Sequence, residues 1–465
     1  MEKNINMTEG KPLKLLVSFA LPLMFGNIFQ QLYTVVDTAI VGRGVGMDAL
    51  AAVGTVDWLN WMFLGIAQGF TQGFSVRMSQ KYGEGDKEGL KRAIGQSVKL
   101  SVVITVLVTV IGQLGVPFFL QVLRVPAEIS GMAELYIRIM LGGFVAMMFF
   151  NFCSSVLRSI GDSQTPLKAM MVASVTNIVL DYVAVFILHW GIAGAAAATL
   201  FSQCLAGTIC AVKIYQSPDL HFGGRHLESD LHMGGNLMKI GAPIAAQNVI
   251  IALGGIVVQS VVNGFGTGFI AGFTATNKLY GLLEIAAISY GYAVTTYVGQ
   301  NYGAGKPERI KNGMNAAVKL SLVTAAAIGV LMIIFGRQIT MLFISAEVPE
   351  LAKVAGDTAY WYLFCMSVSL PVLYLLHVYQ AALRGMGNSV ISMKSGIVEF
   401  CLRVSLSILV GITGFEYGIF GAEVSAWYGA AIFLALSYYR IVHKNTKKCK
   451  RFHNRDRKNW KKVIK

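Results

Sequence analysis

Two polar side chains interrupt an otherwise apolar stretch at residues 174–186, SVTNIVLDYVAVF. Asn177 and Asp181 are four residues apart, which places them one turn apart on the same face of a helix. Another carboxylate, Asp37, lies within the apolar run QQLYTVVDTAIVG. A carboxylate at the centre of a bilayer costs about 2.5–3.5 kcal/mol on insertion scales, so intramembrane carboxylates are usually functional. Two such carboxylates can bind and release a proton or a hard cation.

The elements that must position these side chains are membrane-spanning helices. The chain has 465 residues, of which 55% are hydrophobic and 14% charged, whereas a soluble domain is about 25% charged. Apolar runs long enough to cross a bilayer recur along its whole length. The sequence therefore predicts an all-α integral membrane protein. Twelve helices are expected, at residues 14–41, 49–80, 91–115, 128–157, 165–188, 191–215, 235–262, 270–300, 311–336, 350–384, 391–413 and 418–443.

The distribution of basic residues predicts the orientation in the membrane. Few lysines or arginines lie in the loops that follow odd-numbered helices, namely Arg43, Arg124, Arg337 and Lys353. Basic loops face the cytoplasm, so both termini are expected there, in a multi-pass protein of the plasma membrane. The basic tail, residues 444–465, is expected to rest on anionic lipid. Nucleic-acid binding is not expected, since no nucleic-acid-binding fold accompanies the tail.

The two halves of the chain repeat. The segment QKYGEGDKEGLK at 80–91 matches QNYGAGKPERIK at 300–311, and LRSIGDS at 157–163 matches LRGMGNS at 383–389. Pro22 corresponds to Pro243 in the second copy. Each copy holds six helices, so both begin on the same side of the membrane and form parallel repeats, an arrangement known for transporters. The expected parts are an N-terminal lobe (1–212), a cytoplasmic linker (213–236), a C-terminal lobe (237–443) and the tail.

The motifs QxYGxGxxxxxK and LRxxGxS, each present twice, resemble those of the multidrug and toxic compound extrusion (MATE) family. The resemblance covers roughly residues 14–443. It implies two six-helix bundles that form a V-shaped cavity. It also implies export of organic cations and other amphipathic compounds in exchange for Na⁺ or H⁺. By their residues alone, the glycines of the repeated loops are expected to end helices in left-handed turns.

Two branches of the family differ in where their acidic residues lie. NorM-like members carry them in the seventh and tenth helices, but here the seventh contains no carboxylate and the tenth offers only His377. The chain looks more like the DinF-like branch, in which the first, fifth and sixth helices supply the coupling site. The resemblance assigns this site to Asp37, Asn177, Asp181 and Thr199. The choice between Na⁺ and H⁺ stays open.

The duplication supports a functional interpretation of these carboxylates. In the second copy Asp37 falls on Val258 or Gln259, and Asp181 falls on Ser407. A purely architectural need would be present in both copies. Candidate substrate contacts are aromatic and methionine side chains, which suit a promiscuous pocket, although packing against lipid explains them equally well. Pro22 is a candidate hinge. The candidate substrate contacts are Met147, Met148, Phe149, Tyr280 and Tyr374.

Other intramembrane charges invite structural explanations. Glu399 and Arg403 are four residues apart and could neutralise each other, whereas Lys278 and Glu284 are six apart and do not face one another. An alternative function is a flippase for lipid-linked oligosaccharides, whose diphosphate would need several basic residues in the first-lobe cavity, where only Arg138 is expected. Hydrolase and P-loop motifs are absent. The sequence therefore predicts a monomeric transporter, not an enzyme, that needs no cofactor besides its coupling ion.

Overall fold

The computed structural model describes the backbone of residues 5–123, 125–341 and 349–463, with side chains in the same ranges except Pro349 and the residues beyond His443. In these ranges the chain forms helices and no strand. The helices of the first half are α1 (Pro12–Gly44), α2 (Met47–Glu84), α3 (Lys87–Val122), α4 (Ala127–Gly142), α5 (Phe144–Ser159), α6 (Gln164–Tyr182), η1 (Val183–Ile187) and α7 (Gly191–Tyr215). Those of the second half are η2 (Pro218–Leu220), η3 (Gly224–Leu227), α8 (Leu231–Val262), α9 (Thr267–Gly303), α10 (Pro307–Met341), α11 (Pro349–Gly385), α12 (Ser389–Thr413) and α13 (Gly418–Val463).

The predicted all-α membrane fold is confirmed. Within the described ranges, ten helices are long and apolar enough to cross a membrane, and the bent pair α4–α5 makes an eleventh span. Helix α9 is 37 residues long but carries Lys278 and Glu284, and it corresponds to the remaining predicted helix. Each of the twelve predicted helices is therefore present.

The prediction of one continuous helix over residues 128–157 is wrong. The structure divides it into α4 and α5, which are bent by 44°. The break lies at Gly142 and Gly143, where the absence of side chains lowers the resistance to bending. A Cβ added at Gly143 would overlap the side chain of Leu200 on α7. The missing side chain at Gly143 therefore lets this span approach α7 closely.

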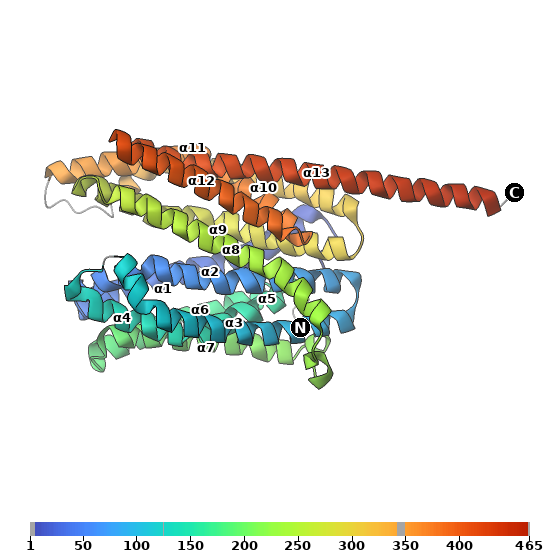
Figure 1. Cartoon of the computed structure of the whole chain (residues 1–465), viewed down its shortest axis with the longest axis horizontal. Helices are drawn as coiled ribbons and strands as arrows, with labels where there is room; N and C mark the ends of the chain where they lie inside the picture. Colours follow the sequence, from blue (N-terminus) through green and yellow to red (C-terminus); the bar gives the residue numbers. More distant parts are fainter. Residues whose placement is uncertain (1–4, 124, 342–348, 464–465) are drawn as a thin grey trace.

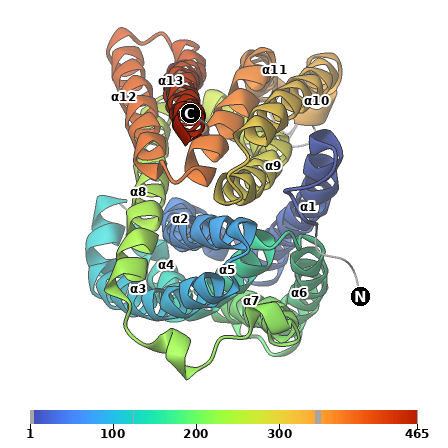
Figure 2. The same ribbon diagram turned by 90° about the vertical axis from the view of Figure 1, so that its right-hand side faces the viewer.

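The helices form two bundles that lie side by side (Figures 1 and 2). Helices α1 to α7 make up one bundle and α8 to α13 the other. Helix α8 packs against α12 in its own bundle and against α2 in the first, and α1 contacts both α6 and α9. We call the first bundle lobe 1 and the second lobe 2.

The segment between the lobes is held against lobe 1. Lys87 pairs with Asp219 at 2.7 Å, and His226 lies 3.1 Å from a carboxylate oxygen of Glu88. The side-chain amide of Gln96 donates to the carbonyl oxygens of His226 and Glu228. The predicted linker is thus attached to the start of α3 along much of its length.

The lobes touch closely at the end of the molecule that carries the N-terminus. Helix α2 crosses α8 with glycines at the contact, since a Cβ at Gly69 would overlap Ala245 and one at Gly73 would overlap Gly241. Further along, a Cβ at Gly83 would overlap the carbonyl oxygen of Gln300. The corresponding Gly303 has the same relation to Gln80. These glycines permit backbone approaches that a larger residue would prevent.

The repeated motifs contact one another across this interface. The side-chain amide of Gln80 donates to the carbonyl oxygen of Gly385 at 3.0 Å. The amide of Gln300 donates to the carbonyl oxygen of Ser159 at 2.9 Å. Residues 80 and 300 are equivalent in the duplication, and so are 159 and 385. The QxYGxG motif of each lobe therefore binds the LRxxGxS motif of the other, and we call this pair of contacts the reciprocal interface.

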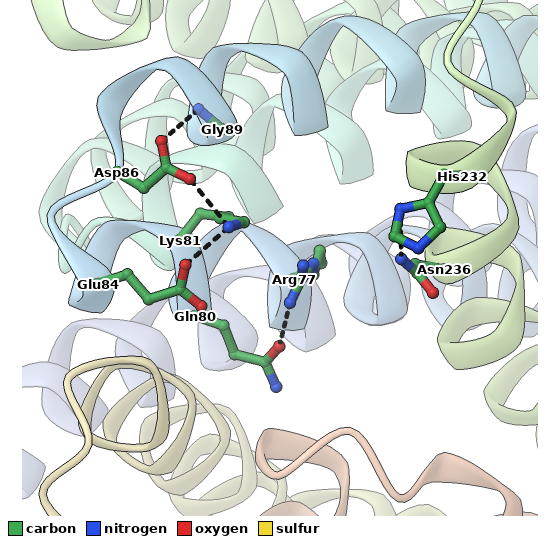
Figure 3. Close-up of polar contacts among 8 residues, drawn as sticks. All are labelled: Arg77, Gln80, Lys81, Glu84, Asp86, Gly89, His232 and Asn236. Carbon is green, nitrogen blue, oxygen red and sulfur yellow. Dashed lines mark hydrogen bonds and ion pairs between the residues drawn. The ribbon is translucent and has the colours of Figure 1, made fainter.

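The predicted helix-ending role holds for two of the four motif glycines, whereas Gly83 and Gly303 are still helical and pack against the opposite lobe. Gly85 ends α2 with a φ of +74°, and Gly305 follows α9 with a φ of +66°. Beside Gly85, Lys81 binds the carboxylates of Glu84 and Asp86, and Asp86 accepts the N–H of Gly89 at the start of α3 (Figure 3). The Lys81 ammonium and this N–H hold the pKa of Asp86 below its usual value, so the cap stays charged at neutral pH.

The segment before α1 enters the same interface. Met7 is fully buried, its N–H donates to the side-chain oxygen of Gln300, and its carbonyl oxygen accepts from Asn301. Ile5 donates its N–H to the carbonyl oxygen of Gly161 in lobe 1. Both lobes therefore hold this segment, which fills the space between them at this end.

Candidate functional site

Three helices of lobe 1 bring the four predicted coupling residues together. Helix α1 supplies Asp37, α6 supplies Asn177 and Asp181, and α7 supplies Thr199. Asp37 and Asp181 lie close enough for their charges to interact. The Asn177 amide donates to the Thr199 hydroxyl at 3.5 Å, the outer limit of a hydrogen bond. Asn177 and Asp181 are 1% and 0% exposed.

The site is rich in acceptor oxygens that lack donors. Within the described part of the chain, no hydrogen-bond partner is found for either carboxylate oxygen of Asp181, for Oδ1 of Asp37 or for Oδ1 of Asn177. Two ionised carboxylates cannot satisfy each other, because each is only an acceptor. Buried acceptors without donors are costly. A proton shared between the carboxylates, or a cation bound to the oxygens, would remove this cost.

The donor set suits a proton or a hard cation such as Na⁺. Carboxylate, amide and hydroxyl oxygens are ligands that hard cations prefer. No group of three or more His, Cys, Asp or Glu side chains that could hold a metal ion is found among the described residues. The site therefore has the oxygen chemistry of a coupling-ion site and lacks the nitrogen and sulfur ligands of a transition-metal centre.

Sequence reasoning missed two members of this site. The Gln203 amide donates to the Tyr33 hydroxyl at 3.4 Å, and its own Oε1 lacks a donor in the described structure. Tyr33 lies one turn before Asp37 on α1, and Gln203 lies one turn after Thr199 on α7. The same four-residue spacing that singled out Asn177 and Asp181 could have found both.

The backbone of the sixth helix changes immediately after Asp181. Helix α6 ends at Tyr182 and continues as a π-helical turn, Val183–Ile187. Single π-helical turns occur frequently at functional sites, because they widen a helix and leave its local hydrogen bonding less regular. Asp181 therefore lies directly before an irregular turn of this span.

The structure places the predicted substrate contacts in both lobes. Met147 and Met148 belong to the core of lobe 1, and Tyr374 belongs to the core of lobe 2, where its hydroxyl donates to the carbonyl oxygen of Leu283. Phe149 packs against Gly207 of α7. Tyr280 stacks on Trp427 with a centroid distance of 5.7 Å. Their role as substrate contacts stays a prediction.

The candidate hinge lies inside a continuous helix. Helix α1 runs unbroken from Pro12 to Gly44 with Pro22 in its interior. Proline lacks the N–H that would bond to the preceding turn and so weakens the helix at this point. A bend at Pro22 that moves Asp37 relative to Asp181 stays a prediction.

The charges of lobe 2 pair differently from the prediction. Arg403 binds Glu423 of α13 at 2.7 Å rather than Glu399 one turn away. Oε1 of Glu399 is buried, with no partner in the described ranges. Glu284 lies 3.1 Å from His377 of α11. The sequence-local pair was incorrect because Glu423 reaches Arg403 from a neighbouring helix, and spacing along one helix cannot reveal such a partner.

The Arg403–Glu423 pair leads to a prediction for stability. Breaking a buried ion pair by removing one partner costs about 3–5 kcal/mol, whereas replacing both partners is often close to neutral. The single change Arg403→Gln is therefore expected to lower the thermal stability of the purified protein strongly. The double change Arg403→Gln with Glu423→Gln is expected to restore most of it. A double variant no more stable than the single variants would show that the ion pair is not the main interaction at this position.

Two repeated bundles of membrane-spanning helices, one of which holds the Asp37–Asp181 pair, are the architecture of a secondary transporter. The MatE family model matches the chain twice, at residues 22–183 and 243–409, and so covers more than half of it. The chain therefore belongs to the MatE family, the multidrug and toxic compound extrusion transporters.

Curated relatives and solved structures agree with this assignment. The probable multidrug resistance protein YpnP of Bacillus subtilis is 30% identical over 78% of this chain and 81% of its own length. The probable multidrug resistance protein NorM of Thermotoga maritima is 23% identical over 88% of each chain. A crystal structure of MATE in complex with MaL6 superposes with a TM-score of 0.88 at 24% identity, covering 96% of this chain and 100% of that one. The match to this solved structure shows that the two chains share a fold.

Proposed function

We propose that the protein is an antiporter that expels amphipathic or cationic small molecules from the cell in exchange for Na⁺ or H⁺. The observation that carries the proposal is the set of donorless oxygens around Asp37 and Asp181 in lobe 1. The duplicated position of Asp181 in lobe 2 is Ser407, so the site belongs to one lobe only. Relatives named as multidrug resistance proteins support the substrate class.

The mechanism needs an ion that distinguishes two arrangements of the lobes. An ion with equal affinity for both arrangements would shift neither. Binding at Asp37 and Asp181 neutralises the buried carboxylates and favours one packing of α1 against α6. Release restores the charge and favours the other packing. One elementary charge moving through 100 mV supplies about 2.3 kcal/mol, which is enough to drive a substantial substrate gradient.

The test is efflux from vesicles that contain only this protein. Ethidium, a fluorescent organic cation, is loaded, and its release is followed under an imposed Na⁺ gradient, an imposed pH gradient or neither. Release that accelerates under one gradient identifies the coupling ion. Release that is equally slow under all three conditions would contradict ion-coupled export.

The orientation of the chain gives a separate prediction. We propose that both termini and the linker face the cytoplasm of a plasma-membrane protein. A cysteine at Gln216, an exposed position just after α7, is then expected to react with a membrane-impermeant thiol reagent only after the cells are opened. Rapid labelling in intact cells would reverse the orientation.

We also propose an oligomeric state and a lipid contact for the protein. The transporter is expected to act as a monomer, because each lobe of the duplicated chain supplies the partner for the other. The basic tail is expected to lie against anionic lipid. Its backbone continues α13 as far as Val463, and its side chains lie outside the described residues.

A further inference from the structure

The duplication places one arginine at the same position in each lobe. Arg158 occupies the LRxxGxS motif at the end of α5, and Arg384 occupies the second copy at the end of α11. Both side chains point into the region where the lobes meet. Because the two arginines are equivalent in the duplication, their surroundings can be compared position by position.

Arg384 is fully engaged by neighbouring side chains. Its Nε donates to the Ser392 hydroxyl at 2.9 Å, and its two terminal nitrogens donate to side-chain oxygens of Gln72 at 2.9 Å and Gln247 at 2.7 Å. We call these three residues the arginine clamp. One of them, Gln72, comes from lobe 1, so the clamp also joins the lobes.

Lobe 1 lacks the equivalent clamp. The repeat offsets place Pro166 at the position of Ser392, Tyr292 at that of Gln72, and Gly26 at that of Gln247. None of these three side chains offers a carbonyl oxygen. The guanidinium of Arg158 lies over the ring of Tyr292, 4.5 Å from its centre. Within the described ranges, no hydrogen-bond acceptor and no carboxylate is paired with it.

A cavity lies where the clamp is missing. It is a small, partly open pocket between α1, α2, α5, α6 and α9, and its lining includes Gly26, Arg158, Pro166 and Tyr292. Further lining groups are the polar side chains of Asn27, Gln30, Gln68, Asn151 and Ser154. Ser154 is 0% exposed, and its hydroxyl has no partner among the residues that the structure describes. The lining contains no acidic residue, so Arg158 carries the only charge.

These observations point to an anionic ligand. A half-buried guanidinium without a counter-ion is unfavourable, and its planar donors match the oxygens of a carboxylate or phosphate. The unpartnered Ser154 hydroxyl and the neighbouring amides can donate further hydrogen bonds. Apolar lining groups such as Phe150 and Met170 can contact the rest of an amphipathic molecule.

We propose that this cavity binds the anionic group, a carboxylate or a phosphate, of an amphipathic substrate, with Arg158 as its counter-ion. The proposal deepens the export function proposed above, because it adds an anion-binding subsite to a transporter of amphipathic compounds. The cavity is lined by both lobes, so a ligand bound there contacts both of the parts that must move during transport.

The test compares three fluorescent probes that share one apolar group. Dansyl-glycine carries a carboxylate, dansyl-ethanolamine phosphate carries a phosphate, and dansyl-glycinamide is neutral. Binding to the purified full-length protein is measured by the change in dansyl emission. At least one anionic probe is expected to bind about tenfold more tightly than the amide, as for a hydrogen bond to a charged group. The preferred anion identifies the ligand class. Equal affinity for all three probes would overturn the proposal.

Variants then assign the selectivity to Arg158. Arg158→Gln is expected to reduce the ratio of anion to amide affinity to about one, and Arg158→Lys to keep part of it. Gly26→Gln returns the missing clamp amide to lobe 1, and a Cβ there meets only ordinary contacts with Leu167. This variant keeps Arg158 but is expected to lose the selectivity. Selectivity that persists in both Arg158→Gln and Gly26→Gln would overturn the assignment.

A matched control and a second readout separate this proposal from antiport. Arg138 pairs with Glu134 away from the cavity, so Arg138→Gln is expected to keep the anion preference. The binding assay needs no ion gradient. A protein that exports ethidium but binds the three probes equally would refute the anion subsite alone. A protein that binds the anions selectively but exports nothing would refute antiport alone.

Discussion

Export driven by an ion gradient is expected to fall to the background rate when either Asp37 or Asp181 is replaced by asparagine. The amide keeps the size of the side chain and removes the charge that the coupling ion neutralises. Both variants are expected to reach the membrane, because removing a buried charge without a counter-ion relieves a desolvation cost. Ethidium efflux from vesicles at matched protein content provides the measurement.

The control for this experiment is a carboxylate outside the site. Asp48 is exposed at the start of α2, so Asp48→Asn is expected to export at the wild-type rate. Wild-type export by both Asp37→Asn and Asp181→Asn would move the coupling site elsewhere. Glu399, which is buried and has one oxygen without a partner among the described residues, would then be the carboxylate to test next.

The second large effect is expected at the reciprocal interface. A side chain at Gly83 or Gly303 would overlap the backbone of the opposite lobe, so Gly83→Val and Gly303→Val are each expected to force the lobes apart at this end. Such a variant should favour the arrangement open on the N-terminal side and should lose turnover, since the lobes can no longer close there. We expect export close to background despite normal insertion.

The measurement is the thiol reactivity of a cysteine placed at the reciprocal interface. Ser79 is 1% exposed and lies at this interface beside Gly299, so a cysteine there should be nearly unreactive in an otherwise unchanged protein. In the Gly83→Val background it is expected to react readily with a thiol reagent applied from the N-terminal side. Gly235→Val serves as the control, because nothing lies within 4 Å of a Cβ at that position. Slow labelling and normal export in Gly83→Val would contradict the prediction, because the interface would then still close around the added side chain.

The grouping of the proposed coupling residues was predictable because its signals are local. Asn177 and Asp181 share a helix face, and a carboxylate in an apolar run is conspicuous. Lobe-crossing contacts have no such signal. Arg158 reads as part of a loop motif in the sequence, and its exposure to a cavity depends on Gly26, Pro166 and Tyr292, which come from three other helices. Only the folded chain shows that these positions surround it.

The bend between α4 and α5 and the ion-pair partner of Arg403 were not predictable for a similar reason. Two adjacent glycines within an apolar run, as at Gly142 and Gly143, occur in straight helices as well as bent ones, so the pair alone does not predict the bend. The partner of Arg403 was mistaken for the same reason. A residue one turn away is visible in the sequence, but Glu423 becomes a neighbour only when α12 and α13 pack together.

The reciprocal interface has a consequence for the ancestry of the chain. A contact in which each half offers the same donor to the same acceptor of the other is isologous, the type that joins identical subunits about a twofold axis. A single six-helix chain carrying both motifs could therefore have paired with its own copy. Gene fusion would then have freed the halves to diverge, so that one kept its arginine occupied and the other exposed it to a ligand.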